Sequence, residues 1–186
     1  MISHKHKCIF VHIPKSAGTS IEKFFIGRDW WFIDKETKHL HAKTAKKIYK
    51  ENWNEYFTFS FVRNPWDLMV SWYKFRKNHN LSFDKFLTEY KINPRRRYWL
   101  PKTLYQTDFL VDDDGKLLID FVGKFENLQE DFNIICDKIK ISQQKLPHKN
   151  KTKRKHYTEY YDDETREIVA KKYAKDIEYF GYKFEA

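Results

Sequence analysis

Short apolar segments alternate with amphipathic segments along the chain. Residues 8–13 and 57–62 are short runs rich in apolar, aromatic and β-branched side chains, which is typical of buried strands. Residues 20–25 and 65–77 follow these runs and carry apolar side chains at helical spacing. Strands that alternate with helices predict an α/β fold, in which helices flank both faces of a mainly parallel sheet.

Local signals indicate where the first two helices begin. Thr19 or Ser20 is suited to cap the first one, because a hydroxyl at that position accepts a hydrogen bond from a free backbone N–H. For the second helix, Asn64 is a good cap, Pro65 fits the first turn, and Asp67 stands where a capping box needs an acid. The second helix is apolar over most of its surface, so we expect it to be largely buried.

The second half of the chain carries the same kinds of signal. The turn sequence Asp-Asp-Asp-Gly at residues 112–115 separates two short apolar runs and predicts a β-hairpin of residues 109–111 and 117–119. Residues 121–125 are expected to continue as a strand. Further helices are expected at residues 42–49, 83–90, 128–139 and from 162 or 163 to 180, with a surface loop at 93–106. No boundary interrupts this pattern, so residues 1–186 are predicted to form a single domain.

The composition is that of a globular protein with a basic balance. Charged residues make up 33% of the chain and hydrophobic residues 41%, and the 36 Lys and Arg against 26 Asp and Glu give a formal net charge of +10. This charge suits an anionic partner, such as nucleic acid, an acidic glycan, a phosphorylated cofactor or a membrane surface. A lysine-rich soluble surface alone would also produce it.

The two cysteines and the lack of long apolar runs bear on location. Cys8 and Cys136 lie in apolar or amphipathic segments, and their spacing fits neither a zinc site nor a disulfide framework. We therefore expect buried free thiols in a reducing compartment. No run approaches the roughly 18 apolar residues of a membrane span, and the first residues lack a signal-peptide pattern, so we expect a cytoplasmic protein. No heptad pattern appears that would indicate an oligomeric state.

The segment from His12 to Ser20 combines the groups that bind an anion at the start of a helix. A strand leads into a loop of small residues and then into a helix, whose free backbone N–H groups and dipole favour negative charge. Lys15 adds a positive charge, and Gly18 allows close approach of the backbone. Hydroxyl donors come from Ser16, Thr19 and Ser20.

The order of residues in this loop differs from that of a nucleotide-kinase phosphate loop. The kinase pattern places lysine directly after its last glycine, whereas Lys15 precedes Gly18 and has no glycine upstream. A kinase also needs an acid that holds magnesium. Asp120 ends an apolar run as such an acid would, but we interpret it as part of the hairpin strand. Arg63, at the end of the second strand, provides a fixed cation that suits a phosphate bound without metal.

Two motifs together resemble those of the sulfotransferases that use 3′-phosphoadenosine 5′-phosphosulfate (PAPS). Residues 12–20 resemble the family's 5′-phosphosulfate loop, and Phe-Val-Arg-Asn-Pro-Trp at residues 61–66, with Ser71, resembles its 3′-phosphate motif. The resemblance extends over nearly the whole chain through residues 123–128, 146–152 and 180–182. It is strongest to the branch that includes heparan and chondroitin 2-O-sulfotransferases and many small bacterial members.

The resemblance implies a P-loop-like three-layer fold and a sulfuryl transfer that needs no metal. It implies that Arg63 and Ser71 grip the 3′-phosphate, that the segment with Lys151 and Thr152 closes over the nucleotide, and that Lys15 stabilises the leaving phosphate. The other residues implied to bind the donor are Ser16, Ala17, Gly18, Thr19 and Ser20. The product would be adenosine 3′,5′-bisphosphate, and the acceptor a hydroxyl, expected on a carbohydrate.

Sulfuryl transfer also needs a base for the acceptor hydroxyl, and histidine is suited to this role near neutral pH. The 2-O-sulfotransferase branch places a histidine and an apolar residue before a helix, which corresponds to His39 in the sequence Lys-His-Leu-His-Ala at residues 38–42. His41 is an alternative for the same role. Both histidines also fit surface positions in a polar segment.

Two rival functions follow from the basic charge and the phosphate loop. Residues 145–155 hold six basic residues and no acid, which also fits a nucleic-acid-binding module. Only Tyr157 is close to this run, so it lacks the aromatic interleaving of single-strand binders, and we favour closure over the nucleotide with no nucleic-acid partner. Residues 95–97, all arginine, fit attraction of an acidic glycan and a solvated loop equally well. A P-loop kinase of a small molecule is the second rival.

Overall fold

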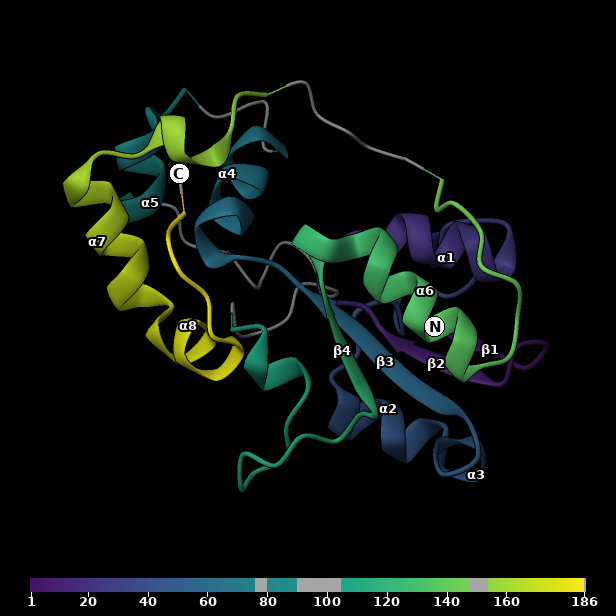
Figure 1. Ribbon diagram of the computed structural model, residues 1–186. Coiled ribbons are helices and arrows are strands. Elements are labelled where there is room, and N and C mark those ends of the chain that lie inside the picture. The colour runs from purple at the N-terminus through teal and green to yellow at the C-terminus, as the bar shows by residue number, and fades with distance from the viewer. Residues whose placement is uncertain (76–79, 90–104, 148–153, 186) are drawn as a thin grey trace.

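A four-stranded, mainly parallel sheet forms the centre of the molecule (Figure 1). The computed structural model describes residues 1–75, 80–89, 105–147 and 154–185. The strands are β1 (Ile2–Ser3), β2 (Cys8–Val11), β3 (Phe57–Val62) and β4 (Phe121–Lys124), in that order across the sheet. β2, β3 and β4 are parallel, which confirms the predicted α/β fold, whereas the short β1 pairs antiparallel with β2 and was not expected.

Helices cover both faces of the sheet because its strands are apolar on both sides. α1 (Gly18–Ile26) and α6 (Leu128–Lys138) lie on one face, and α2 (Ala42–Ile48) and α3 (Lys50–Trp53) lie on the other (Figure 1). Phe10 and Phe59 pack toward α1 and α6, whereas Ile9 and Val11 pack with residues of α2 and α3. Parallel strands buried on both faces explain why β2 is a continuous apolar run.

A third group of helices lies beyond the carboxyl ends of β2 and β3 (Figure 1). It contains α4 (Pro65–Phe75), α5 (Phe83–Glu89), α7 (Asp163–Lys172) and α8 (Ala174–Phe180). Trp66, Met69, Phe86 and Tyr173 are buried together at its centre. Residues 65–70 of α4 are all buried, which confirms the expectation from its apolar sequence. Short 3₁₀ helices are η1 (Trp30–Phe32), η3 (Thr107–Phe109), η4 (Phe125–Asn127) and η5 (Tyr157–Tyr160).

Two expected elements differ in extent from the structure. The predicted hairpin is reduced to one antiparallel bridge between Val111 and Leu117, because residues 107–109 form η3 instead of a strand. The single helix expected up to residue 180 is divided at Tyr173 into α7 and α8. The division coincides with the burial of Asp176, whose carboxylate accepts hydrogen bonds from two backbone N–H groups at the start of η3.

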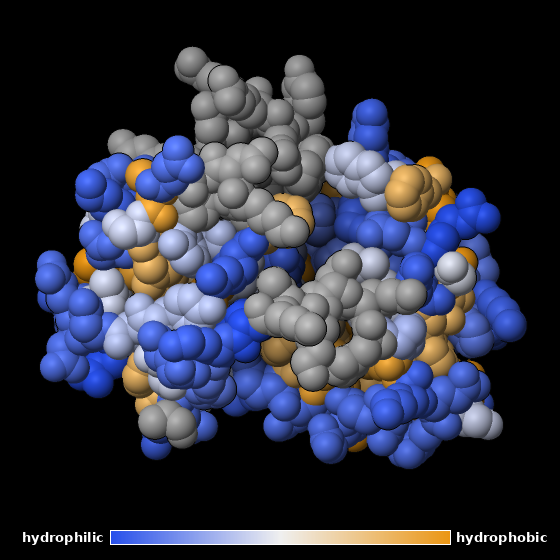
Figure 2. All heavy atoms as spheres, turned by 90° about the horizontal axis from the view of Figure 1, so that it is seen from above, coloured by the Kyte–Doolittle hydropathy of each residue, from blue (hydrophilic) through white to orange (hydrophobic). Residues whose placement is uncertain are grey.

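Polar residues cover most of the surface seen in Figure 2, where hydrophobic residues form small separate patches. Such a surface agrees with a chain in which a third of the residues are charged. Within the described ranges, no helix combines the length and the apolar character needed to cross a membrane.

Candidate active site

Residues 12–20, which the sequence predicts to bind the sulfate donor and which are called the donor loop below, join the carboxyl end of β2 to α1. Lys15 and Ala17 adopt left-handed backbone conformations, with φ angles of 71° and 62°. For a residue with a side chain this conformation costs about 1–2 kcal/mol, and it recurs where a loop turns its backbone N–H groups toward an anion. The loop therefore has the strained backbone that is typical of a binding site.

The start of α1 differs from the prediction. The helix begins at Gly18, with Ala17 at the capping position and no side-chain capping bond. The expected cap by Thr19 or Ser20 is wrong, because the left-handed Ala17 already turns the chain into the helix. Thr19 Oγ1 instead donates a hydrogen bond to Asp29 Oδ2 (3.2 Å).

Gly18 is packed against the buried imidazole of His12. A β-carbon added at Gly18 would lie 1.9 Å from His12 Nε2, which is far inside van der Waals contact. The loop thus requires glycine at this position for packing inside the protein, in addition to the expected access of an anion to the backbone.

A buried carboxylate, that of Glu22, ties the donor loop to the segment before α2. Glu22 Oε1 lies 2.6 Å from His12 Nδ1, and Oε2 accepts hydrogen bonds from Lys38 Nζ (2.9 Å) and from the Trp30 backbone N–H (3.0 Å). Burial raises the pKa of this carboxyl, but His12 and Lys38 more than offset that effect and lower the pKa to about 2. Lys38 also forms an ion pair with Asp29. No local signal indicates this cluster in the sequence, because its members are up to 26 residues apart and meet only in the fold.

His39 lies directly against the donor loop. Its Nδ1 is 3.0 Å from the carbonyl oxygen of His12, and the two imidazole rings are 4.5 Å apart between centroids. A carbonyl oxygen only accepts hydrogen bonds, so Nδ1 carries the proton and Nε2 of the neutral ring carries the lone pair. Burial lowers the pKa of His39 well below its usual value, so the ring is neutral near pH 7.

His41 occupies a different environment. Its ring stacks on Phe109, with centroids 4.4 Å apart, and it lines a cavity of about 330 Å³ together with Asp108, Asp113 and Lys175. Of the two candidate bases, His39 is the one whose hydrogen bond reaches the donor loop. The structure places the two histidines in different surroundings, and the role of His39 as the base stays a prediction.

Arg63 connects the second phosphate motif to the donor loop. It follows β3, and its Nη1 donates to the carbonyl oxygen of Lys15 (2.8 Å). Its Nε and Nη2 both lie 2.8 Å from Asp67 Oδ2, and its guanidinium stacks on the Phe125 ring at 3.8 Å. Asp67 therefore does not complete a capping box as expected. The backbone N–H of Asn64 donates instead to Glu126 Oε1 (2.7 Å).

Gln106 forms a second link between the two motifs. This side chain is fully buried, and its Oε1 accepts a hydrogen bond from the Arg63 backbone N–H (2.8 Å), while its Nε2 donates to the Arg63 carbonyl oxygen (2.7 Å). Ser16 Oγ, from the donor loop, approaches the same Oε1 at 3.5 Å. Gln106 thus fixes the position of Arg63 relative to the donor loop, a role that sequence reasoning did not find.

Lys15 is the cation of the donor loop, and its ammonium lies 4.1 Å from the centre of the Phe75 ring. Burial and the nearby charges of Arg63 and Arg154 lower its pKa to about 8. Most of the lysine is therefore still charged at pH 7, and a bound anion would raise its pKa further.

The structure describes some, but not all, of the remaining residues that the sequence predicts to bind the donor. Ser20 is buried in the first turn of α1, and Ser71 is half-buried in α4, seven residues beyond Asn64 and about 10 Å along the helix. Lys151 and Thr152 lie outside the described residues, so their expected role stays a prediction. The same holds for the arginines at residues 95–97.

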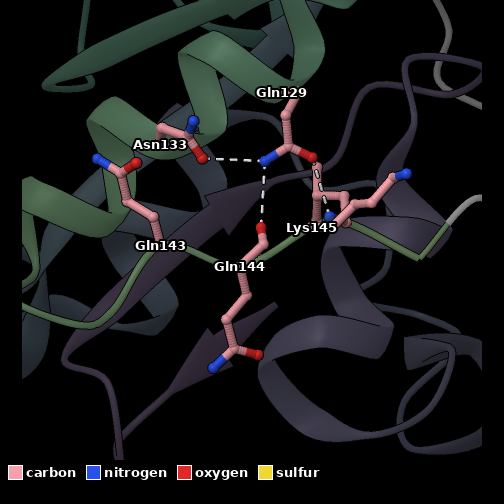
Figure 3. Close-up of a pocket in the computed structure, with 6 residues that line it drawn as sticks. Gln129, Asn133, Gln143, Gln144 and Lys145 are labelled. Atoms are coloured by element: carbon pink, nitrogen blue, oxygen red, sulfur yellow. Dashed lines mark hydrogen bonds between the residues drawn. The ribbon is translucent and has the colours of Figure 1, made fainter.

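A separate pocket lies between α6 and residues 143–146 and contains none of the predicted site residues (Figure 3). Gln129 Nε2 donates to Asn133 Oδ1 (2.9 Å) and to the Gln144 carbonyl (3.1 Å), while its Oε1 accepts from the Leu146 N–H (3.0 Å). These bonds attach the segment to α6, so packing explains the amide side chains at this place.

Asp120 is remote from both phosphate motifs. Its Oδ2 accepts hydrogen bonds from the backbone N–H and from Oγ1 of Thr58, both at 2.8 Å. Thr58 lies near the amino end of β3, whereas the donor loop and Arg63 follow the carboxyl ends of β2 and β3. Asp120, the acid that a kinase could use to hold magnesium, therefore lies near the amino end of β3, away from both phosphate motifs.

A sequence profile of the sulfotransferase family matches residues 1–183. The chain belongs to the sulfotransferase family. An uncharacterized protein of Archaeoglobus fulgidus is 34% identical to this family member over 112 residues, which cover 56% of this chain and 82% of the relative. No solved structure is significantly similar in the comparison.

Family membership makes sulfuryl transfer the general chemistry of this protein. Lys15 of the donor loop and Arg63 are cations, and His39 is a neutral imidazole that contacts His12, the first residue of the loop. Within the described part of this sulfotransferase-family member, no cluster of three or more His, Cys, Asp or Glu side chains is arranged to hold a metal ion.

Proposed function

We propose that this protein transfers the sulfuryl group of PAPS to a hydroxyl group of a carbohydrate. The observation that carries the proposal is the hydrogen bond from Arg63 to the Lys15 carbonyl, which joins two cationic motifs at the same edge of the sheet. A donor with a 5′-phosphosulfate and a 3′-phosphate needs two such motifs side by side. The carbohydrate acceptor rests on the resemblance to the 2-O-sulfotransferase branch.

The residues fit the chemistry that PAPS supplies, which is a sulfuryl group activated by its bond to a phosphate. The acceptor oxygen forms a new S–O bond while the S–O bond to the phosphate breaks, and adenosine 3′,5′-bisphosphate leaves. His39 takes the proton of the acceptor hydroxyl at Nε2. Lys15 and the backbone N–H groups of the donor loop stabilise the negative charge that develops on the leaving phosphate.

A calorimetric titration tests this proposal against both rivals. Tight binding of adenosine 3′,5′-bisphosphate without magnesium is the expected result, and absence of binding would overturn the proposal. Binding of ATP that requires magnesium would instead support a kinase. Binding of oligonucleotides that depends steeply on salt, without preference for the bisphosphate, would support a nucleic-acid-binding module.

Turnover is then measured with labelled donor and a panel of hydroxyl acceptors. Transfer to sugar hydroxyls and not to phenols or simple alcohols supports the carbohydrate assignment. Transfer to phenols or simple alcohols and not to sugar hydroxyls would overturn the carbohydrate acceptor and leave sulfuryl transfer as the proposed reaction.

We also propose a cytoplasmic location. Cys8 and Cys136 are free, buried thiols, which is typical of proteins in a reducing compartment. Burial raises the pKa of the Cys8 thiol to about 12, so this thiol is unreactive at neutral pH.

A further inference from the structure

Lys38 is a buried lysine that comes directly before His39, in the segment between η1 and α2. Its side chain is only 7% exposed. Lysine is almost never buried unless it is paired with an acid, and Lys38 is paired with two. Its Nζ donates to Glu22 Oε2 (2.9 Å) and also forms an ion pair with Asp29 Oδ1. The proposed reaction assigns no role to this ammonium group.

Each of these two carboxylates also binds a residue of the donor loop. Glu22 Oε1 lies 2.6 Å from Nδ1 of the His12 imidazole. Asp29 Oδ2 accepts a hydrogen bond from Thr19 Oγ1 (3.2 Å). His12 is the first residue of the loop, and Thr19 lies near its end. Lys38 is therefore connected, through one carboxylate each, to both ends of the donor loop.

His39 completes this set of contacts. Its Nδ1 lies 3.0 Å from the carbonyl oxygen of His12, the residue whose imidazole is held by Glu22. His12 is thus joined to the segment before α2 in two ways, by its carbonyl oxygen to His39 and by its ring, through Glu22, to Lys38. Two adjacent residues of that segment are fixed to the same residue of the donor loop, which restricts movement of the His39 ring relative to the loop.

The burial of these ion pairs favours a role in positioning. The side chain of Glu22 is fully buried and that of Asp29 is 22% exposed. Apolar side chains of similar size often stabilise a fold as well as a buried ion pair does, so stability alone does not require charges at this place. Buried charges do, however, have to keep their partners, which gives the pairs a strict geometry. They are therefore suited to hold His39 at a defined place beside the donor loop.

We propose that Lys38 is a positioning residue for His39, because its ion pairs with Glu22 and Asp29 hold the imidazole where it takes the proton of the acceptor hydroxyl. The inference rests on the proposed function, since it takes His39 as the base. Lys38 acts on turnover through His39 and not through contact with the donor or the acceptor. A base must lie within hydrogen-bond reach of the proton that it takes, so a small displacement of the ring lowers the rate of transfer.

A double-mutant cycle tests this inference. Labelled donor gives kcat for the wild type, K38M, H39A and K38M/H39A, at a temperature where circular dichroism shows that all four are folded. We expect K38M to lower kcat by about tenfold or more, and by no more than H39A does, because a misplaced base loses much of its effect. In the H39A background the same substitution should change kcat by about twofold at most, since the residue through which Lys38 acts is then missing.

Donor binding is the second measurement. K38M should bind adenosine 3′,5′-bisphosphate within about twofold of the wild type, because Lys15 and Arg63 are positioned by their own bond and by Asp67. A purely structural role, in which K38M loosens the whole donor loop, would weaken this binding. It would also lower kcat by the same factor with and without the His39 imidazole.

K43M is the matched control, because it makes the same substitution nearby in the chain. Lys43 is exposed and forms its ion pair with the exposed Asp113. An exposed ion pair contributes little, so K43M should keep both kcat and the affinity for the bisphosphate within about twofold of the wild type.

D29N is the second variant, in case K38M does not fold. It removes one of the two carboxylates that bind Lys38 and keeps the size of the side chain, at a position that is partly exposed. We expect D29N to lower kcat by about threefold or more in the wild type and by less than about twofold in the H39A background.

The outcomes separate the inference from the proposed function. Full turnover in K38M, or in D29N where K38M does not fold, would overturn the inference alone. Equal losses of kcat with and without the His39 imidazole would do the same. Full turnover in H39A, or no turnover of the wild type with any acceptor, would instead overturn the proposed function as stated and the inference with it.

Discussion

Gly18 and His12 are in such close contact that no side chain fits between them. A β-carbon at Gly18 would meet the His12 ring at 1.9 Å from Nε2. His12 itself is held at 2.6 Å by Glu22, which is fully buried, so its ring has little freedom to move away. The shape of the donor loop therefore depends on the packing of a histidine at its beginning.

Substitution of Gly18 by Ala should deform the donor loop. We expect G18A to lower the free energy of unfolding by about 1–3 kcal/mol through overpacking, and to weaken binding of adenosine 3′,5′-bisphosphate. Chemical denaturation and calorimetry measure the two effects. G115A is the control, because Gly115 has a left-handed φ of 80°, which a residue with a side chain rarely adopts, but open space around it. It should lose about 1 kcal/mol of stability and keep the wild-type affinity; wild-type affinity in G18A would contradict this prediction.

Removal of the His39 imidazole should separate catalysis from donor binding. We expect H39A to lower kcat by about 100-fold or more, because a general base contributes this much, while the Kd for adenosine 3′,5′-bisphosphate changes little. Labelled donor and calorimetry provide the two measurements. H41A, which removes the ring stacked on Phe109, should retain most of the turnover. Full activity of H39A would rule out its role as the base.

The pH profile of kcat/KM should report two groups of the free enzyme. His39 must be neutral to accept a proton, and its pKa is lowered by burial, so the acidic limb should lie below pH 6.5. Lys15 must be charged and has a pKa of about 8, so activity should fall as the pH rises through about 8. In K15R the basic limb should disappear, because arginine stays charged over this range. A basic limb that persists in K15R would belong to another group.

Glu22 should stabilise the fold in a manner that depends on pH. Its pKa is about 2 in the folded protein, below its usual 4.5, so its contribution is complete above pH 4.5 and is lost as the pH falls through 2. This corresponds to about 3 kcal/mol. E22Q should therefore be about 3 kcal/mol less stable than the wild type at pH 7 and nearly equal to it at pH 2. E167Q, an exposed control, should follow the wild type at every pH; parallel curves for E22Q and the wild type would contradict the prediction.

The elements predicted well from the sequence are those in which local signals agree with burial. The strand at residues 57–62, the strand expected at residues 121–125 and observed at Phe121–Lys124, and the buried helix that begins at Pro65 were predicted because local composition and spacing agreed with burial. The signals of the hairpin were also local, but residues 107–109, just before its expected first strand ends, form the 3₁₀ helix η3 instead. Its position depends on Asp176, which lies nearly 70 residues further along the chain.

The residues predicted to bind the donor are indicated by local sequence signals, whereas the buried polar groups around them depend on distant partners. Lys15 and Arg63 belong to contiguous motifs, so their spacing alone is enough to predict a role in donor binding. Gln106 and Glu22 could not be found, because a buried amide or carboxylate in a sequence looks the same as an exposed one until its partners are known.

The bond between Arg63 and the Lys15 carbonyl has a consequence for selectivity. Because the protein itself connects the two motifs that we propose to bind phosphate, their separation is defined before any nucleotide arrives. A ligand whose two phosphate groups are spaced differently, such as an adenosine 2′,5′-bisphosphate, would have to break this bond or leave one motif empty. The site would then distinguish regioisomers of a nucleotide by the spacing of their phosphate groups, without any contact to the base.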